Sequence, residues 1–331
     1  MNAEQNEKKI TRVEEIIKSQ ELDTTCVLSL TITKDNRIAS GGANGNISIS
    51  SYNINKCSWN IDIYKKKAHE YRVGYLCSLN DNRLLSCGVE NSIKVWSISD
   101  EDITLLKEIK EQHTDTVWKM IPLSNERFAS CSGDCTVKIW ESDTYQLLST
   151  LTHDESVRSI IQLKYKEVLV SCTYHIEHNE KSRPRYNEGL NCIYFWDLNN
   201  NTKQYTIERI CVNSPNHMIE LSDGNIALST NKKKTHCPII IIDKSSYQKQ
   251  EIESKEYITN GSSLCAYANH SFIYACKGTL LQISNDGSIL FQSKGGKDSF
   301  IGSFGVIPIE DGNYFVIDNG NCISIIKLCY D

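Results

Sequence analysis

Three histidines at nearly regular spacing are the residues of this sequence best suited to chemistry. His69, His113 and His153 each have Val four positions later, and the gaps between them are 44 and 40 positions. Imidazole is a general acid–base group near neutral pH and the commonest protein ligand of metal ions. The pattern therefore indicates a catalytic cluster, a metal site, or a residue that recurs because a structural unit repeats.

Carboxylates and indoles recur together with the histidines. Asp134 lies six positions before Trp140, and Glu90 lies six positions before Trp96. The two tryptophans are again 44 positions apart. A zinc site requires a set of metal ligands, but it gives no reason for a tryptophan to recur at the same spacing. The common spacing therefore favours a structural repeat over a metal site.

The elements that must position these residues are short strands. From residue 112 onward the chain has two apolar runs, VWKMIPL and RFASCS, then a tight turn and a third run, TVKIW. In three units the first Val precedes an Arg by ten positions, as in Val27 and Arg37, and a polar hairpin turn lies just before the Arg. One copy of such a unit cannot bury both of its faces, so neighbouring copies must pack on it.

This unit resembles a repeat of the WD40 β-propeller family, whose repeats run ~40–45 residues and fold as four-stranded blades. The resemblance is specific over residues 26–198, and the units beyond them keep only the strand rhythm. Unit four also carries an insertion between its second and third strands. The resemblance implies an all-β fold, a seven-bladed WD40-like β-propeller formed by residues 1–331 as a single domain.

The N-terminal segment bears on how such a ring would close. Apolar residues within 10–17 recur at helical spacing, but the same stretch resembles ITLLKEIK at 103–110, an expected outer strand. A propeller whose last blade lacks a strand keeps an unpaired edge. We therefore expect residues 9–19 to be a strand, rather than a helix, that completes the blade formed by residues 298–331.

The resemblance also implies a buried chain of hydrogen bonds inside each blade. In the family, the carboxylate of a turn accepts from His, His accepts from a Ser of the second strand, and the indole N–H finds a partner in the same chain. The members implied here are His69, Ser86, Glu90 and Trp96; His113, Ser130, Asp134 and Trp140; and His153 with Trp196. The histidines would then be structural and lie on separate blades, too far apart to share a metal ion.

Motifs for other chemistry are not found in the sequence. It contains no Gly-rich phosphate loop, no G-x-S-x-G and no H-E-x-x-H. The first strands of the units are mostly apolar, which leaves His217 and Glu220 as the acid–base candidates for a propeller channel. We expect a non-enzymatic protein with no catalytic residue, no cofactor and no metal site.

The binding surface that the resemblance implies is the top face, which carries the loops that open each unit and those between second and third strands. The expected partner-binding residues flank or align with the start of the first strands: Tyr71, Arg72, Trp118, Arg158 and Asn216. Trp and Arg are common anchors of protein interfaces. Trp118 is the sharpest candidate, and packing between blades is the alternative role for it. We expect a scaffold or adaptor that docks proteins or peptides on this face.

Two basic loops are expected to be neighbours on the top face. They contain Lys181, Arg183 and Arg185 in unit four, and Lys232, Lys233 and Lys234 in unit five. Together they would form a patch for an acidic or phosphorylated segment of a partner. One alternative is that both loops are simply solvated. Another is that residues 181–185 and 232–234 bind a phosphate-bearing ligand directly, such as a nucleic acid or a phosphoinositide.

The composition limits the class of protein. The 331 residues are 40% apolar, enough for a large core, and a net charge of -5 argues against wholesale nucleic-acid binding. No apolar run indicates a secretion signal or approaches the ~18 residues of a membrane span. Cys87, Cys131 and Cys172 end second strands, so we expect the 14 cysteines to be reduced core residues. Such cysteines are typical of a cytoplasmic protein, with the nucleus as the alternative.

Overall fold

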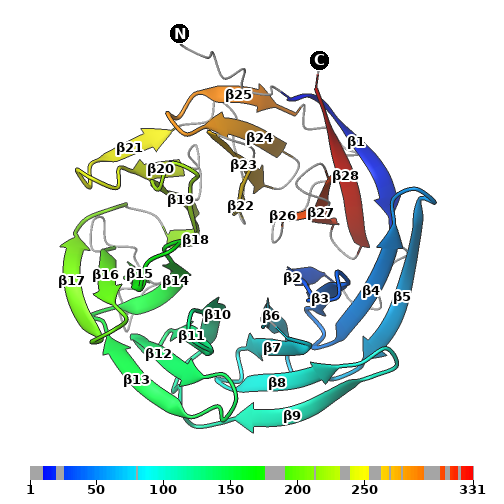
Figure 1. Ribbon diagram of the computed structural model, residues 1–331, viewed down its shortest axis with the longest axis horizontal. Helices are drawn as coiled ribbons and strands as arrows, with labels where there is room; N and C mark the ends of the chain where they lie inside the picture. The colour runs from blue at the N-terminus through cyan, green and yellow to red at the C-terminus, as the bar shows by residue number, and fades with distance from the viewer. Residues whose placement is uncertain are drawn as a thin grey trace, which may run out of the picture.

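The computed structural model of this protein is a ring of small β-sheets. The residues that it describes are 10–19, 26–79, 81–175, 191–211, 214–231, 239–252, 262–267, 270–276, 279–293, 306–309, 314–319 and 322–330. Within them, 28 strands form seven four-stranded antiparallel sheets, arranged as blades around one axis (Figure 1). No helix occurs in these ranges. The predicted all-β, seven-bladed propeller is confirmed.

Each blade runs outward from the axis through four strands. The inner strands are β2 (Val27–Ile32), β6 (Val73–Ser78), β10 (Val117–Leu123), β14 (Ser156–Gln162), β18 (Ser214–Glu220), β22 (Ser262–Ala266) and β26 (Val306–Ile309). The second strands are β3 (Ile38–Gly42), β7 (Arg83–Gly88), β11 (Arg127–Ser132), β15 (Val168–Tyr174), β19 (Ile226–Asn231), β23 (Ser271–Cys276) and β27 (Tyr314–Asn319).

The outer half of each blade continues in the same order. The third strands are β4 (Ile47–Asn53), β8 (Ile93–Ile98), β12 (Thr136–Glu141), β16 (Ile193–Asp197), β20 (Ile239–Ile242), β24 (Thr279–Ser284) and β28 (Cys322–Tyr330). The outer strands are β5 (Ser58–Lys65), β9 (Ile103–Ile109), β13 (Leu147–Thr152), β17 (Thr202–Ile207), β21 (Lys249–Ile252), β25 (Ile289–Gln292) and β1 (Ile10–Lys18). We number the blades one to seven, beginning with β2–β5.

The last blade takes its outer strand from the other end of the chain. The register of β1 against β28 runs from Ile10 opposite Tyr330 to Lys18 opposite Ser324. The side chains of Ile10 and Ile17 are 1% and 4% exposed, and burial of such a side chain contributes ~1.5–3 kcal/mol. The segment is therefore a strand, as predicted, because a helix would leave the edge of β28 unpaired.

The hydrophobic core lies between adjacent blades, in seven clusters that the described residues form around the ring. Between blades one and two, for example, Ala39 and Ile49 pack with Leu76 and Trp96. Each sheet is covered by a neighbour on both faces, so its inner and second strands are apolar on both faces rather than alternating. This explains why runs such as VWKMIPL contain few polar residues.

Arginines repeat at the start of the second strands and connect neighbouring blades at the face opposite the top face. In blades one to three each guanidinium donates to a backbone carbonyl of the next blade: Arg37 to Ser99 at 2.9 Å, Arg83 to Ser142, and Arg127 to Leu198 at 3.3 Å. A carboxylate also pairs with each of them, as Asp81 does with Arg83. The regular spacing of these arginines is visible in the sequence, but their hydrogen bonds to the next blade are not.

Candidate functional site

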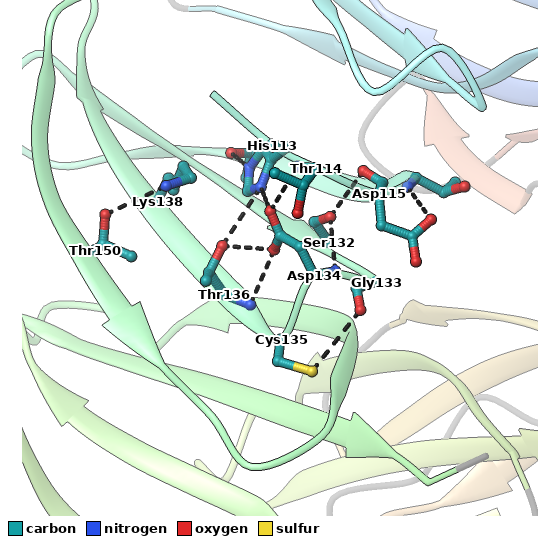
Figure 2. Close-up of polar contacts among 12 residues, drawn as sticks. His113, Thr114, Asp115, Ser132, Gly133, Asp134, Cys135, Thr136, Lys138 and Thr150 are labelled. Atoms are coloured by element: carbon teal, nitrogen blue, oxygen red, sulfur yellow. Dashed lines mark hydrogen bonds and ion pairs between the residues drawn. The ribbon is translucent and has the colours of Figure 1, made fainter. Parts of the chain in front are cut away.

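Blade three brings its four predicted polar residues into one continuous chain. Trp140 Nε1 donates to Ser130 Oγ at 2.9 Å, and His113 Nε2 lies 2.8 Å from the same oxygen. His113 Nδ1 lies 2.8 Å from a carboxylate oxygen of Asp134 (Figure 2). Every group is satisfied if the indole donates to Ser130, Ser130 to His113, and His113 to Asp134. No member then bears the ~1–3 kcal/mol cost of an unpaired buried polar group.

Blade two repeats this arrangement with a glutamate. Trp96 Nε1 donates to Ser86 Oγ at 2.7 Å, and His69 Nε2 lies 2.7 Å from that oxygen. His69 Nδ1 is hydrogen-bonded to the carboxylate of Glu90. The longer side chain of Glu90 thus reaches the same ring nitrogen that aspartate reaches in blade three.

The carboxylates of the two chains also fix the loops of the top face. Glu90 accepts a hydrogen bond from the backbone N–H of Tyr71 at 2.7 Å, and Asp134 accepts one from that of Thr114 at 3.1 Å. Burial raises the pKa of Glu90, but the hydrogen bonds from His69 and Tyr71 outweigh it and lower the pKa to about 2. The pKa of Asp134 is lowered in the same way against burial. Both groups are therefore charged acceptors that position a top-face loop at neutral pH.

Blade four forms a chain that ends on the backbone. His153 Nε2 lies 2.7 Å from Ser171 Oγ, which accepts from Trp196 Nε1 at 3.1 Å, and His153 Nδ1 donates to the carbonyl of Leu151 at 3.1 Å. Burial, with no carboxylate bonded to the ring, lowers the pKa of His153 to about 4. Ser171 was missed by the sequence analysis. It directly precedes Cys172, as the corresponding serines of blades two and three precede a cysteine, and that Ser-Cys pair was the available signal.

The three histidines therefore lie apart, each bonded to the serine of its own blade. Among the described residues, no group of three His, Cys, Asp or Glu side chains is placed to hold a metal ion. The cysteines that the structure describes are all free thiols. The part of the molecule in which side chains from different blades do converge is the axis of the ring.

A cavity of about 680 Å³ lies on this axis and is lined by residues from all seven inner strands. Near the start of five of these strands a β-bulge inserts one extra residue into the pairing. The extra residues are Leu28, Gly74, Trp118, Arg158 and Asn216. A bulge redirects the side chain that it carries, and all five residues line the cavity.

Four of the five partner-binding residues predicted near the starts of the first strands meet at this cavity. Trp118, Arg158 and Asn216 line it from bulges, and Arg72 lines it from the loop before β6. Gly88 allows that loop to approach, because a Cβ at residue 88 would lie 2.2 Å from the carbonyl oxygen of Arg72. Tyr71 does not line the cavity, and its side chain is 57% exposed on the adjoining loop.

Trp118 is both packed and accessible to the cavity. Its ring packs on the core between blades three and four, and the Arg158 guanidinium lies over the ring at 3.7 Å from the centroid. Its indole N–H is buried without a hydrogen-bond partner in the described part of the chain. The packing alternative considered for Trp118 is therefore observed, and it does not remove the residue from the cavity wall.

The remaining candidates are not brought into one site. His217 lines the cavity, and its Nδ1 accepts from the backbone N–H of Leu264 at 3.0 Å. Burial, together with the charge on Lys119, lowers the pKa of His217 to about 3, so the ring is neutral. Glu220 accepts from the backbone N–H of Lys164 at 2.5 Å. Residues three apart on a strand point to opposite faces, so His217 and Glu220 do not form an acid–base pair.

The predicted basic patch lies outside the described residues. It consists of Lys181, Arg183 and Arg185 in one loop and of Lys232, Lys233 and Lys234 in the other. Both the patch and direct phosphate binding by these two loops remain predictions.

The fold and its internal chains define the molecule as a seven-bladed β-propeller with a histidine–serine–tryptophan chain in three blades. The WD domain, G-beta repeat model matches residues 61–97 and 104–141, which run from β5 to β8 and from β9 to β12. Two of its units therefore match the WD40 repeat, and the chain has the fold of a seven-bladed WD40-like β-propeller.

Similar proteins agree with this assignment. The crystal structure of the WD40 β-propeller domain of Doa1 superimposes with a TM-score of 0.72, covering 96% of this chain and 97% of that one, at 16% identity. A probable cytosolic Fe-S cluster assembly factor of Schizosaccharomyces japonicus (strain yFS275 / FY16936) is 33% identical over 82 residues. That alignment spans 24% of this chain and 13% of the relative's length. Within the described ranges, no helix has the length and apolar character needed to cross a membrane.

Proposed function

We propose that this protein is a non-enzymatic scaffold that docks proteins or peptides on its top face. The observation that carries the proposal is the convergence of Trp118, Arg158 and Asn216 on the axial cavity, with Tyr71 exposed on an adjoining loop. Bulges in their strands carry all three residues, and all three side chains line the cavity. WD40 propellers commonly act as protein-interaction scaffolds, which supports the same function.

The size and lining of the cavity fit a peptide side chain or a short peptide segment. Its volume of about 680 Å³ falls within the ~300–1,000 Å³ that ligand pockets usually have. Trp, Tyr and Arg are the residues most enriched among the energetic anchors of interfaces. The partner segment is acidic or phosphorylated in this proposal, because the charged residues described on the cavity wall are basic.

The cytosol is the compartment that we assign to this function. The buried cysteines at the ends of second strands, such as Cys87 and Cys131, are free thiols, and thiols persist in reducing compartments. The relative from Schizosaccharomyces japonicus is named as a cytosolic assembly factor. Docking of partners on a rigid ring is compatible with work inside such an assembly.

A pair of tyrosines tests the docking function. Tyr71 is exposed on the top face, whereas Tyr165 is fully exposed in the loop between β14 and β15, on the opposite face. We expect Tyr71→Ser, alone or with Asn216→Ala, to lower the recovery of specific partners in quantitative affinity capture. Tyr165→Ser is the matched control and should leave recovery unchanged. Equal recovery with both single variants and with the double variant would reject the top face as the docking surface.

A further inference from the structure

The charges that line the axial cavity are all of one sign. Arg72, Lys119 and Arg158 line it, and no Asp or Glu occurs among the described residues of its wall. The chain as a whole carries a net charge of -5. Three cations without a carboxylate on such a protein create a local positive potential, which a low-dielectric wall focuses into the cavity.

Lys119 is the most deeply placed of the three cations. It follows the bulge residue of β10, its side chain is 5% exposed, and its Nζ lies 3.4 Å from Ser159 Oγ. Burial lowers the pKa of Lys119 to about 8, so most molecules carry the charge at pH 7. A buried ammonium is stable only when charge and hydrogen bonds compensate it. The one hydroxyl at 3.4 Å leaves most of its donor capacity for an anion.

Arg158 is held in position by stacking rather than by an ion pair. Its guanidinium lies 3.7 Å from the ring centroid of Trp118 and 5.8 Å from that of Tyr174. Stacking occupies the face of the guanidinium plane and leaves the N–H donors at its edge. Neither Arg158 nor Arg72 has a carboxylate partner in the described part of the chain. The positive charge of Arg72 also disfavours the charged form of Arg158 and, after burial, contributes to its lowered pKa.

We propose that the axial cavity is a phosphate-binding subsite that takes the phosphorylated side chain of a peptide partner, with Arg72, Lys119 and Arg158 as its donors. The inference rests on the proposed docking function and names the chemistry of its ligand. A phosphate monoester carries a charge of about -1.5 to -2 and three acceptor oxygens, which match three cationic donors. The single charge of a glutamate or aspartate would leave more of the positive charge uncompensated.

Peptide pools that differ at one position test this subsite. One fluorescent pool carries a fixed phosphoserine flanked by random residues, and the other two carry Ser or Glu at that position. In fluorescence anisotropy we expect the phosphoserine pool to bind at least about tenfold more tightly than the Ser pool, since a charge-assisted hydrogen bond is lost without the phosphate. The Glu pool should lie between them. Equal affinity for the phosphoserine and Ser pools would overturn the proposal.

Substitutions in the wall of the axial cavity test whether the phosphate binds there. Arg158→Gln and Lys119→Met should each weaken binding of the phosphoserine pool by about 10- to 100-fold, the usual effect of removing one charged donor. Gly74→Glu would place a carboxylate among the cations. A Cβ at residue 74 has no neighbour closer than 3.6 Å, so the first atom of the new side chain makes only ordinary van der Waals contacts. Gly74→Gln is its matched control, and only the glutamate should abolish binding. Loss in both variants, or in neither, would contradict the subsite.

The same experiment includes two other kinds of ligand that carry phosphate. Two competitors are tested separately: vesicles that contain a phosphoinositide, and a single-stranded RNA. If they bind in an Arg158-dependent manner while the phosphoserine pool does not, the peptide proposal is wrong. The docking function is judged separately by the Tyr71→Ser capture experiment. Specific partners that are lost with that variant, combined with no preference for phosphoserine, would leave the scaffold standing and remove the phosphate subsite.

Discussion

Blades three and five fill the same positions with opposite chemistry. Met120 of blade three faces Ser130 across the first two strands, and Met218 of blade five faces Leu228 in the same register. Where blade three has Trp140 on its third strand, blade five has Ile242, which is likewise fully buried. The position of the blade-opening histidine is taken by the buried Ile210, whose backbone N–H bonds to the preceding blade as that of His153 does. The same backbone thus supports a polar chain in one blade and plain apolar packing in the other.

The two blades differ in how the contributions of single side chains to the free energy of unfolding combine. In a polar chain each member satisfies its neighbours, so loss of an inner member leaves two others unpaired and buried. Apolar side chains lose only their own transfer free energy and that of the cavity left behind. Blades two to four should therefore react more strongly to small chemical changes than blades five to seven.

The largest expected effect comes from removing the central hydroxyl of blade three. Ser130→Ala deletes one oxygen but leaves the indole of Trp140 and Nε2 of His113 without their partner. Two unpaired buried groups at ~1–3 kcal/mol each predict a loss of about 2–6 kcal/mol in the free energy of unfolding. Urea unfolding followed by circular dichroism measures it.

The control lies in blade five. Ile242→Val removes one buried methyl group from the position that Trp140 occupies in blade three, and it should cost only about 0.5–1.5 kcal/mol. If both variants lose the same free energy, the polar chain of blade three has no special cooperativity.

The next effect is acid sensitivity, which separates blade four from blades two and three. The folded pKa of His153 is about 4, below its ordinary value of 6.5, so the unfolded chain binds more protons between these values. Stability should then fall as pH falls through this window, by about 1.4 kcal/mol per pH unit and about 2 kcal/mol at pH 5. The lowered pKa values of Glu90 and Asp134 act in the other window: their contribution is present above about pH 4 and is lost only below it.

Urea unfolding at pH 7 and pH 5 measures this difference. Burial also lowers the pKa of His217. This residue therefore makes both the wild type and a His153 variant less stable as pH falls. His153→Gln should therefore have a shallower pH dependence than the wild type rather than none. An unchanged slope in the variant would show that blade four is not the acid-sensitive part of the ring.

A smaller effect is expected from the arginines that connect blades one to four. Arg83→Ala removes hydrogen bonds to Ser142 and Tyr145 and the pair with Asp81. The guanidinium is partly exposed, so screening by water limits the loss to about 1–2 kcal/mol. Arg12→Ala, which breaks an exposed pair with Glu14, should change the midpoint of thermal unfolding very little. Equal shifts for the two variants would show that the inter-blade hydrogen bonds add nothing.

The smallest effect should be found in blade one, where Ser50 occupies the tryptophan position. Its hydroxyl is buried and has no hydrogen-bond partner among the described residues. Ser50→Ala removes an unsatisfied group, so we expect a change within about 0.5 kcal/mol or a slight stabilisation. Differential scanning calorimetry of this variant beside Ser130→Ala compares two buried serines that differ in whether they have partners. A destabilisation as large as that of Ser130→Ala would be incompatible with the comparison.

The features that could be predicted from the sequence are those that repeat. The common phase of His113 and Trp140 with their counterparts identified the blades, and the incomplete last unit predicted the role of residues 10–17 as a strand. Arg158 and Asn216 were selected because they align with Trp118. All of these inferences used local spacing, which a repeat fold preserves.

The features that could not be predicted depend on pairing between strands. A bulge is a property of two strands together, so the run VWKMIPL gives no sign that Trp118 leaves the register and that Lys119 follows it towards the axis. A lysine within an apolar run is otherwise expected at a solvated position. The carbonyl of Ser142 that accepts from Arg83 lies in another blade, which spacing along the chain cannot show.

The pairing of β1 with β28 has a consequence for biosynthesis. Ile10 leaves the ribosome about 320 residues before its register partner Tyr330, and at ~5–20 residues per second that delay is roughly 15–60 s. Throughout this interval the first strand has no native partner, although the blades behind it can fold. Neighbouring nascent chains on one messenger would present identical free strands at close range, and a chaperone bound to β1 during translation would keep these strands from pairing with one another.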